Sequence, residues 1–190
     1  MLRARWLLLF SIVTLLPGCA AVVVAGAATG AAVAHDRRTF GSIVDDQTIE
    51  MKAGSAIVGN SDLRGQTHVN ITSVNGIVLL TGEATTLEAR DQVLQTVREV
   101  NGVRRITNEL RIAEPSPVGN RSKDALITSA VKSRFLVARH LDPTRFKVVT
   151  ENNAVYLMGI VTRDEGDLAA EQAATIDGVE RVVKIFEYLD

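Results

Sequence analysis

The feature that most constrains the fold of this chain is an internal duplication. Residues Val69–Gly82 align with Phe146–Gly159, which begin 77 residues further along the chain. Both segments have the pattern of a strand, a tight turn and a second strand ending in glycine, with Asn75-Gly76 and Asn152-Asn153 at the turns. Asn-Gly flanked by apolar alternation is typical of a two-residue β-hairpin, because both turn positions need a positive φ. The sequence therefore predicts two copies of one small unit.

The duplication extends to both sides of the hairpin. Upstream, Asp46–Ile57 matches Asp124–Phe135, and downstream, Asn101–Ile106 matches Asp177–Val182. Apolar residues in both upstream segments recur with the spacing of one buried helix face, which Gly54 weakens in the first copy. These residues are Ile49, Ala53 and Ile57 in the first copy and Ile127, Ala130, Val131 and Phe135 in the second.

The segments after each hairpin complete the unit. A second helix is predicted over residues 87–100 and 164–176, and Gly102 and Gly178 then stand where glycine commonly ends a helix. A last strand follows over 103–112 and 179–189. The order αββαβ, present twice, predicts an α+β fold in which two helices cover a three-stranded mixed sheet.

Acidic residues stand near the expected start of each first helix. Asp45 and Asp46 are interpreted as first-turn carboxylates that complement the helix dipole, and Ser122 or Asp124 as a cap of the matching helix.

The N-terminal segment has the features of an export signal. Arg3 and Arg5 precede the apolar run 6–16, which is too short to span a bilayer, and the sole cysteine of the chain follows at Cys19. The junction Leu16-Pro17-Gly18-Cys19 resembles a bacterial lipobox, although Pro17 departs from the usual pattern. The resemblance implies cleavage after residue 18, lipidation of Cys19 and, from Ala20 at the next position, sorting to the outer membrane. The alternative is an ordinary buried free cysteine.

Composition argues against several classes of function. The 21 basic and 22 acidic side chains leave a net charge of −1, which disfavours a nucleic-acid-binding protein. The sequence contains no GxSxG, HExxH, GxxxxGKS or GxGxxG motif, and its three histidines are scattered. We therefore expect no catalytic residues, no metal site and no cofactor.

The hairpin and closing-strand motifs carry a family resemblance. In the first copy the pattern consists of hairpin residues and of residues before and in the last strand: Asn75, Gly76, Val78, Leu80 and Gly82, then Gly102, Val103, Ile106 and Asn108. In the second copy the matching residues are Val155, Leu157, Gly159, Gly178, Val179 and Val182. This pattern resembles the BON domain, and a lipobox followed by two such domains is similar to dual-BON outer-membrane lipoproteins. Departures are Asn153 for the usual glycine and Lys184 for the usual asparagine.

The resemblance implies a non-enzymatic role in outer-membrane integrity, at the division site, with binding of anionic phospholipid such as phosphatidylglycerol or cardiolipin. Together with the N-terminal signal features and the two prolines and one glycine in 113–119, which favour a linker, it predicts this division of the chain: signal peptide 1–18, lipidated cysteine and Ala/Gly-rich tether 19–43, BON domain 1 44–112, linker 113–120 and BON domain 2 121–190.

The second copy contains a basic segment that could support lipid binding. Residues 121–147 carry seven basic and two acidic groups, a net charge of +5. With Ile127, Val131 and Phe135 buried, the first helix of this copy turns other residues away from its core. The predicted lipid-binding residues are Leu126, Ser129, Lys132, Ser133, Arg134 and Leu136. Two alternatives are an ordinary solvated helix face and an adaptor surface for an envelope or cell-division protein.

Overall fold

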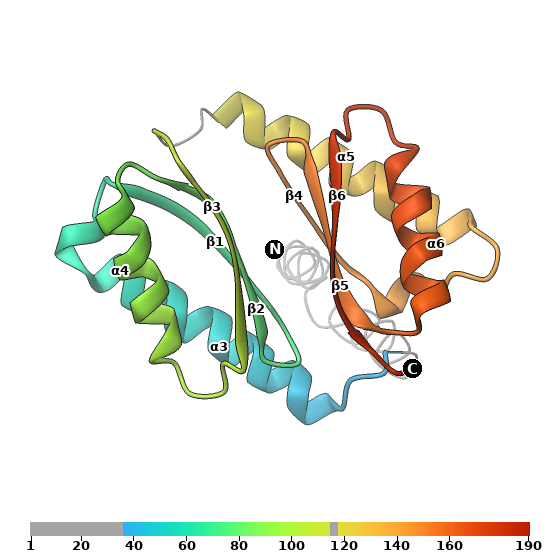
Figure 1. The fold of residues 1–190 in the computed structure, drawn as a ribbon, viewed down its shortest axis with the longest axis horizontal. Helices are drawn as coiled ribbons and strands as arrows, with labels where there is room; N and C mark the ends of the chain where they lie inside the picture. Colours follow the sequence, from blue (N-terminus) through green and yellow to red (C-terminus); the bar gives the residue numbers. More distant parts are fainter. Residues whose placement is uncertain (1–35, 115–117) are drawn as a thin grey trace, which may run out of the picture. The chain divides into compact units, whose positions relative to one another are not determined.

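The computed structural model describes residues 36–114 and 118–190, and residues 37–190 form one compact unit. The first repeat contains α3 (Phe40–Gly59), the hairpin β1 (Thr67–Val74) and β2 (Ile77–Ala84), α4 (Leu87–Arg98) and β3 (Arg105–Ile112). The second contains α5 (Val118–Val137), β4 (Lys147–Glu151), β5 (Ala154–Val161), α6 (Arg163–Ala174) and β6 (Arg181–Tyr188) (Figure 1). The predicted αββαβ order is confirmed in both repeats.

Each repeat has a three-stranded mixed sheet. The hairpin strands pair antiparallel, and the last strand pairs parallel with the second, so that β2 and β5 are central. The helices of each repeat cover one face of its sheet (Figure 1). The predicted core residues Ile49, Ala53 and Ile57 are buried against the first sheet, and Ile127, Val131 and Phe135 against the second.

Two hairpin turns have the predicted backbone conformation. Asn75 and Gly76 have φ of 51° and 72°, and Asn152 and Asn153 have φ of 49° and 60°. Asparagine tolerates this region better than most residues, which lets the second hairpin keep its turn without glycine.

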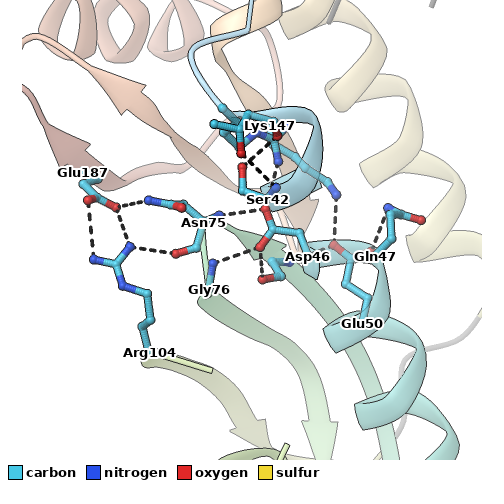
Figure 2. Close-up of polar contacts among 12 residues, drawn as sticks. Ser42, Asp46, Gln47, Glu50, Asn75, Gly76, Arg104, Lys147 and Glu187 are labelled. Atoms are coloured by element: carbon cyan, nitrogen blue, oxygen red, sulfur yellow. Dashed lines mark hydrogen bonds and ion pairs between the residues drawn. The ribbon is translucent and has the colours of Figure 1, made fainter. Parts of the chain in front are cut away.

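The interpretation of Asp45 and Asp46 as first-turn carboxylates was wrong. Helix α3 begins at Phe40 with Thr39 as its N-cap, which places Asp46 in the second turn and buries it. Its carboxylate accepts hydrogen bonds from the Ser73 hydroxyl at 2.6 Å and from the backbone N–H groups of Asn75 and Gly76 at 2.7 and 2.9 Å (Figure 2). A buried carboxylate therefore holds the turn of the hairpin against the helix.

The second repeat uses the same device. Asp124 is buried and accepts from the backbone N–H groups of Asn152 and Asn153 at 2.9 and 3.0 Å. It is not a helix cap, because α5 already begins at Val118, inside the stretch predicted as a linker. The helix thus starts before the residues proposed to cap it.

The two sheets pack on each other through the faces that their helices leave open. Ile77–Ala84 is buried along its whole length, because one face of β2 meets the helices and the other meets the second sheet. The apolar residues of this contact are Val74, Ile77, Leu79, Ala154, Tyr156, Met158 and Ile185. Polar pairs surround them, among them Lys147 with Glu50 at 3.0 Å and Arg104 with Glu187 at 3.1 Å (Figure 2).

Replacing Asp46 tests the turn contact. Asp46→Ala leaves the buried N–H groups of the turn without an acceptor, so we expect the free energy of unfolding to fall by about 3 kcal/mol in urea denaturation. Asp45→Ala is the matched control; the side chain of Asp45 is exposed, and its loss should change stability by about 0.5 kcal/mol or less. Equal midpoints for the two variants would contradict the contact.

Two helical glycines give opposite predictions. A Cβ at Gly54 would meet nothing within 4 Å, whereas one at Gly166 would lie 2.9 Å from two ring carbons of the buried Phe186. Gly54→Ala should stabilise the protein by roughly 0.5–1 kcal/mol, and Gly166→Ala should destabilise it by roughly 1–3 kcal/mol. Thermal unfolding of the two variants measures both, and a shift of the same sign in both would contradict the packing of α6.

Two carboxylates between the sheets predict opposite pH dependences. Burial raises the pKa of Glu151. A hydrogen bond from Asn70 lowers this pKa, whereas the nearby carboxylates of Glu83 and Asp124 raise it further. Burial also opposes ionisation of Glu187, but hydrogen bonds from Asn75 and Arg104 outweigh it and lower the pKa of this carboxyl.

Ionised Glu151 therefore costs stability at neutral pH, and this cost disappears as the pH falls through its raised pKa. Ionised Glu187 contributes stability at neutral pH that is lost as the pH falls through its lowered pKa. At pH 7 we expect Glu151→Gln to stabilise and Glu187→Gln to destabilise, with both differences shrinking in acid. Urea denaturation across the acid range measures this, and differences that do not vary with pH would refute it.

Candidate lipid-binding face

Helix α5 is anchored by one face in the core of the second repeat. Ile127, Val131 and Phe135 are 8%, 0% and 1% exposed, and the ring of Phe135 meets that of Phe146 edge to face at 5.5 Å. The predicted inward stripe is confirmed at these three positions, whereas Ala130 is only half-buried. Since an α-helix turns about 100° per residue, the residues between these positions point away from the domain.

The outward side of α5 exposes large apolar side chains. Leu126 and Leu136 are 72% and 71% exposed, and the predicted Ser129 and Ser133 are exposed beside them. Val137, which is not among the predicted lipid-binding residues, is 74% exposed. It lies 11 residues after Leu126 and so on the same side of the helix, a spacing that could have identified it.

Four cations accompany these apolar residues. Lys132 lies on one flank of the outward side, while Lys123 and Arg134 lie on the other, and Arg139 follows the helix. All four are exposed, and Asp124, the sole acidic residue between 118 and 140, is turned inward. We call the set Lys123, Leu126, Ser129, Lys132, Ser133, Arg134, Leu136 and Val137 the α5 face.

Arg134 differs from the other cations of the α5 face. Its Nε donates a 2.7 Å hydrogen bond to Gln172 of α6, which holds the side chain toward the neighbouring helix. Within the described part of the chain, no ion pair involves Lys123, Lys132 or Arg139. Their charges are therefore available to an anionic surface.

The rest of the basic segment serves the fold. Arg145 pairs with Glu165 and, at 3.4 Å, with Asp142, and Lys147 pairs with Glu50 of the first repeat. The charges of Arg145 and Lys147 are thus compensated by carboxylates that lie outside α5. Sequence counting could not separate these cations from the exposed ones.

Other functional classes gain no geometric support. In residues 36–114 and 118–190, no three His, Cys, Asp or Glu side chains come together as a metal site. Among the described helices, none is long and apolar enough to cross a membrane. The predicted lipidation site, Cys19, lies outside the described residues.

Two αββαβ units joined sheet to sheet define a tandem α+β repeat protein. The chain belongs to the BON domain family, whose model matches residues 45–114 and 123–190. These ranges cover most of the described structure.

Curated relatives match almost the whole chain. It is 38% identical over 175 residues to "Outer membrane lipoprotein DolP" of Haemophilus influenzae, covering 92% of this chain and 91% of that protein. It is 35% identical to the "21 kDa hemolysin" of Actinobacillus pleuropneumoniae, covering 81% of this chain and 79% of that protein. A solved structure of CdsD, a structural protein of the type III secretion system of Chlamydia trachomatis, is 15% identical, covers 76% of this chain and 63% of that chain, and has a TM-score of 0.30, too low to support an argument.

Proposed function

We propose that this protein is an outer-membrane lipoprotein that binds anionic phospholipid through the α5 face. The observation that carries the proposal is the combination of three exposed apolar side chains with four exposed cations and no exposed acid from residue 118 to 140. The name of the H. influenzae relative supports the location in the outer membrane. The role is one of binding, in which no step of catalysis is involved.

The energetics of this surface suit reversible binding. Each Lys or Arg near an anionic membrane contributes about 1 kcal/mol, and burying one Leu or Val side chain contributes roughly 1.5–3 kcal/mol. The exposed residues Leu126, Leu136 and Val137 could enter the boundary between headgroups and acyl chains while Lys132 and Lys123 pair with phosphates. Phosphatidylglycerol and cardiolipin are the lipids that we propose.

The anchor and the α5 face would act together. If Cys19 is lipidated, the chain between Cys19 and the start of the compact unit at Arg37 can extend up to roughly 60 Å, enough for α5 to reach the same membrane. Two weak membrane contacts on one chain reinforce each other, because the second becomes intramolecular. We infer from this arrangement, and from the family resemblance, a role in outer-membrane integrity at the division site.

Reversing two cations tests the lipid proposal. We expect Lys123→Glu with Lys132→Glu to reduce binding of a 36–190 fragment to phosphatidylglycerol vesicles more than tenfold, since four units of charge change at about 1 kcal/mol each. The measurement is vesicle sedimentation, with phosphatidylcholine as the uncharged comparison. Wild-type binding should also weaken with added salt.

Arg64→Glu with Arg98→Glu is the matched control, because it changes the net charge equally on exposed residues of the first repeat. The control should bind as the wild type does. Equal losses in both variants would mean that net charge alone drives binding. Absence of wild-type binding at low salt would favour the second candidate, an adaptor in which the α5 face engages an acidic envelope protein.

Replacing the cysteine tests the anchor. Cys19→Ala removes the sole thiol of the chain, so the variant should fold normally but accumulate as an unlipidated or uncleaved precursor. Membrane fractionation together with the electrophoretic mobility of the mature form measures this. Maturation of the variant and its recovery with the outer membrane would rule out the lipoprotein assignment.

A further inference from the structure

A small pocket of about 200 Å³ lies between α5 and the strand β4. It adjoins the α5 face, because Lys132 is part of its lining. The same flank of α5 faces β4 one turn earlier, where the hydroxyl of Thr128 bonds that of Thr150 at 2.7 Å. Strand β4 is an edge of its sheet, so one side of its backbone has no neighbouring strand. We call this space the β4-edge pocket.

Four cations line the β4-edge pocket, and each comes from a different segment of the chain. Lys132 belongs to α5 and Lys147 to β4, while Arg145 lies in the short turn before β4 and Arg38 precedes α3. Among the described residues, no Asp or Glu lines the pocket; the other lining residues are Val74, Thr144, Phe146, Val148, Met158 and Gly159. The lining is therefore cationic and otherwise mostly apolar.

Carboxylates outside the pocket hold three of these cations: Arg38 pairs with Asp46 at 3.2 Å, Lys147 with Glu50 at 3.0 Å (Figure 2), and Arg145 with Glu165. Each pair uses only part of the donor capacity, because a guanidinium has five N–H donors and an ammonium has three. Within the ranges that the structure describes, Lys132 takes part in no hydrogen bond and no ion pair. The pocket therefore combines positioned cations with one uncompensated cation.

The edge of β4 adds a backbone donor. Because β4 ends in a two-residue turn, its residues alternate, counted from that turn, between those bonded to β5 and those whose N–H points to the open edge. Val148 is of the second kind. The first repeat shows the same alternation, since Ser73 has the matching parity on β1 and donates its N–H to Glu50 at 2.8 Å.

The fold of the repeat does not require these cations. At the offset of 77 residues, the first repeat has Ser55, His68 and Asn70 where the second has Lys132, Arg145 and Lys147. The first repeat forms the same helix and hairpin without a lysine or arginine at any of these positions. The convergence of cations on one pocket of the second repeat is thus a property of this repeat alone.

We propose that the β4-edge pocket binds a single phosphate group, that of an anionic phospholipid whose acyl chains meet the exposed apolar side chains of α5. Lysine, arginine and backbone N–H groups are the donors that commonly bind phosphate in proteins. The identification of the source as a lipid rests on the proposed function, because Lys132 joins the pocket to the α5 face. Free inorganic phosphate is the other source of the same chemistry.

Titration of a 20–190 fragment with soluble ligands tests the proposal. The fragment contains the whole compact unit and keeps the native residues before Arg38. The probes are inorganic phosphate, dihexanoyl phosphatidylglycerol and dihexanoyl phosphatidylcholine, with both lipids kept below the concentration at which they form micelles. Phosphatidylglycerol should bind most tightly. Phosphatidylcholine should bind roughly tenfold more weakly, since its trimethylammonium group would lie among the cations.

Substitutions separate the pocket from the ion pair beside it. Lys147→Gln should lower the affinity for phosphatidylglycerol roughly tenfold, through loss of one charge-assisted hydrogen bond, and Lys132→Gln, at an exposed position, should do the same. Glu50→Gln breaks the same ion pair but leaves Lys147 in the pocket, so it should bind at least as tightly as the wild type. Arg98→Gln, on the exposed side of α4, controls for net charge and should bind as the wild type does. Thermal unfolding verifies that each variant is folded.

The amide group of Val148 reports where the ligand binds. In amide correlation NMR spectra, its resonance should shift during the titration with phosphatidylglycerol. The resonance of Ile71, at the matching position of β1, should not shift.

The pocket is overturned if the wild type binds none of the probes, if folded Lys132→Gln and Lys147→Gln bind as the wild type does, or if Val148 shifts no more than Ile71. Tighter binding of inorganic phosphate than of phosphatidylglycerol would overturn the lipid as the source. Vesicle binding that persists after any of these results would leave the proposed function standing without the pocket. Conversely, ligand binding that Lys147→Gln weakens, in a chain that does not bind vesicles, would support the pocket and reject the lipid surface.

Discussion

The contact between the two sheets determines which surfaces this protein can offer to partners. Val74, Ile77 and Leu79 of the first repeat pack against Tyr156, Met158 and Ile185 of the second. Each sheet therefore has one face against its own helices and the other against the partner sheet (Figure 1). Since the apolar faces of both sheets are buried in this way, the large exposed apolar groups are found chiefly on the outward sides of helices. The α5 face is one such surface, and the outward side of α3, where Phe40, Met51 and Val58 are exposed, is another.

The two repeats keep one folding device and differ in what they expose. Asp46 and Asp124 occupy matching positions and each hold the turn of a hairpin by accepting backbone N–H groups. The outward sides of the same two helices have diverged, because α5 exposes four cations in or beside it and α3 exposes a balanced pair of charges. Duplication thus supplied one scaffold whose two first helices expose surfaces of different charge.

The local features of this fold could be predicted from sequence, because they depend on residues close together in the chain. The turn at Asn75-Gly76 and the buried face of α5 follow from local conformational preference and helical spacing. The role of Asp46 could not, since its partners lie 27 to 30 residues away and a carboxylate near a helix start has a simpler local explanation. The uninterrupted apolar run at 77–80 was the available signal that the central strand is buried on both faces.

The candidate site was predictable in its apolar part and less so in its charges. Helical spacing identified Leu126 and Leu136, because exposure on a helix follows directly from the position of its buried stripe. Which cations remain available depends on contacts with other elements, as Lys147 with Glu50 and Arg134 with Gln172 show. Those contacts join residues far apart in sequence, and only the folded structure reveals them.

The most direct test of the central claim is the depth of α5 in a membrane. A spin label at Leu126→Cys or Val137→Cys, in the 36–190 fragment bound to phosphatidylglycerol vesicles, reports its immersion through the relative accessibility to oxygen and to a water-soluble relaxation agent. We predict that both positions lie below the headgroups, while a label at Val58→Cys on α3 remains in water. Labels at 126 and 137 that stay fully water-accessible on bound protein would contradict the account, and immersion of position 58 in their place would assign the membrane surface to α3.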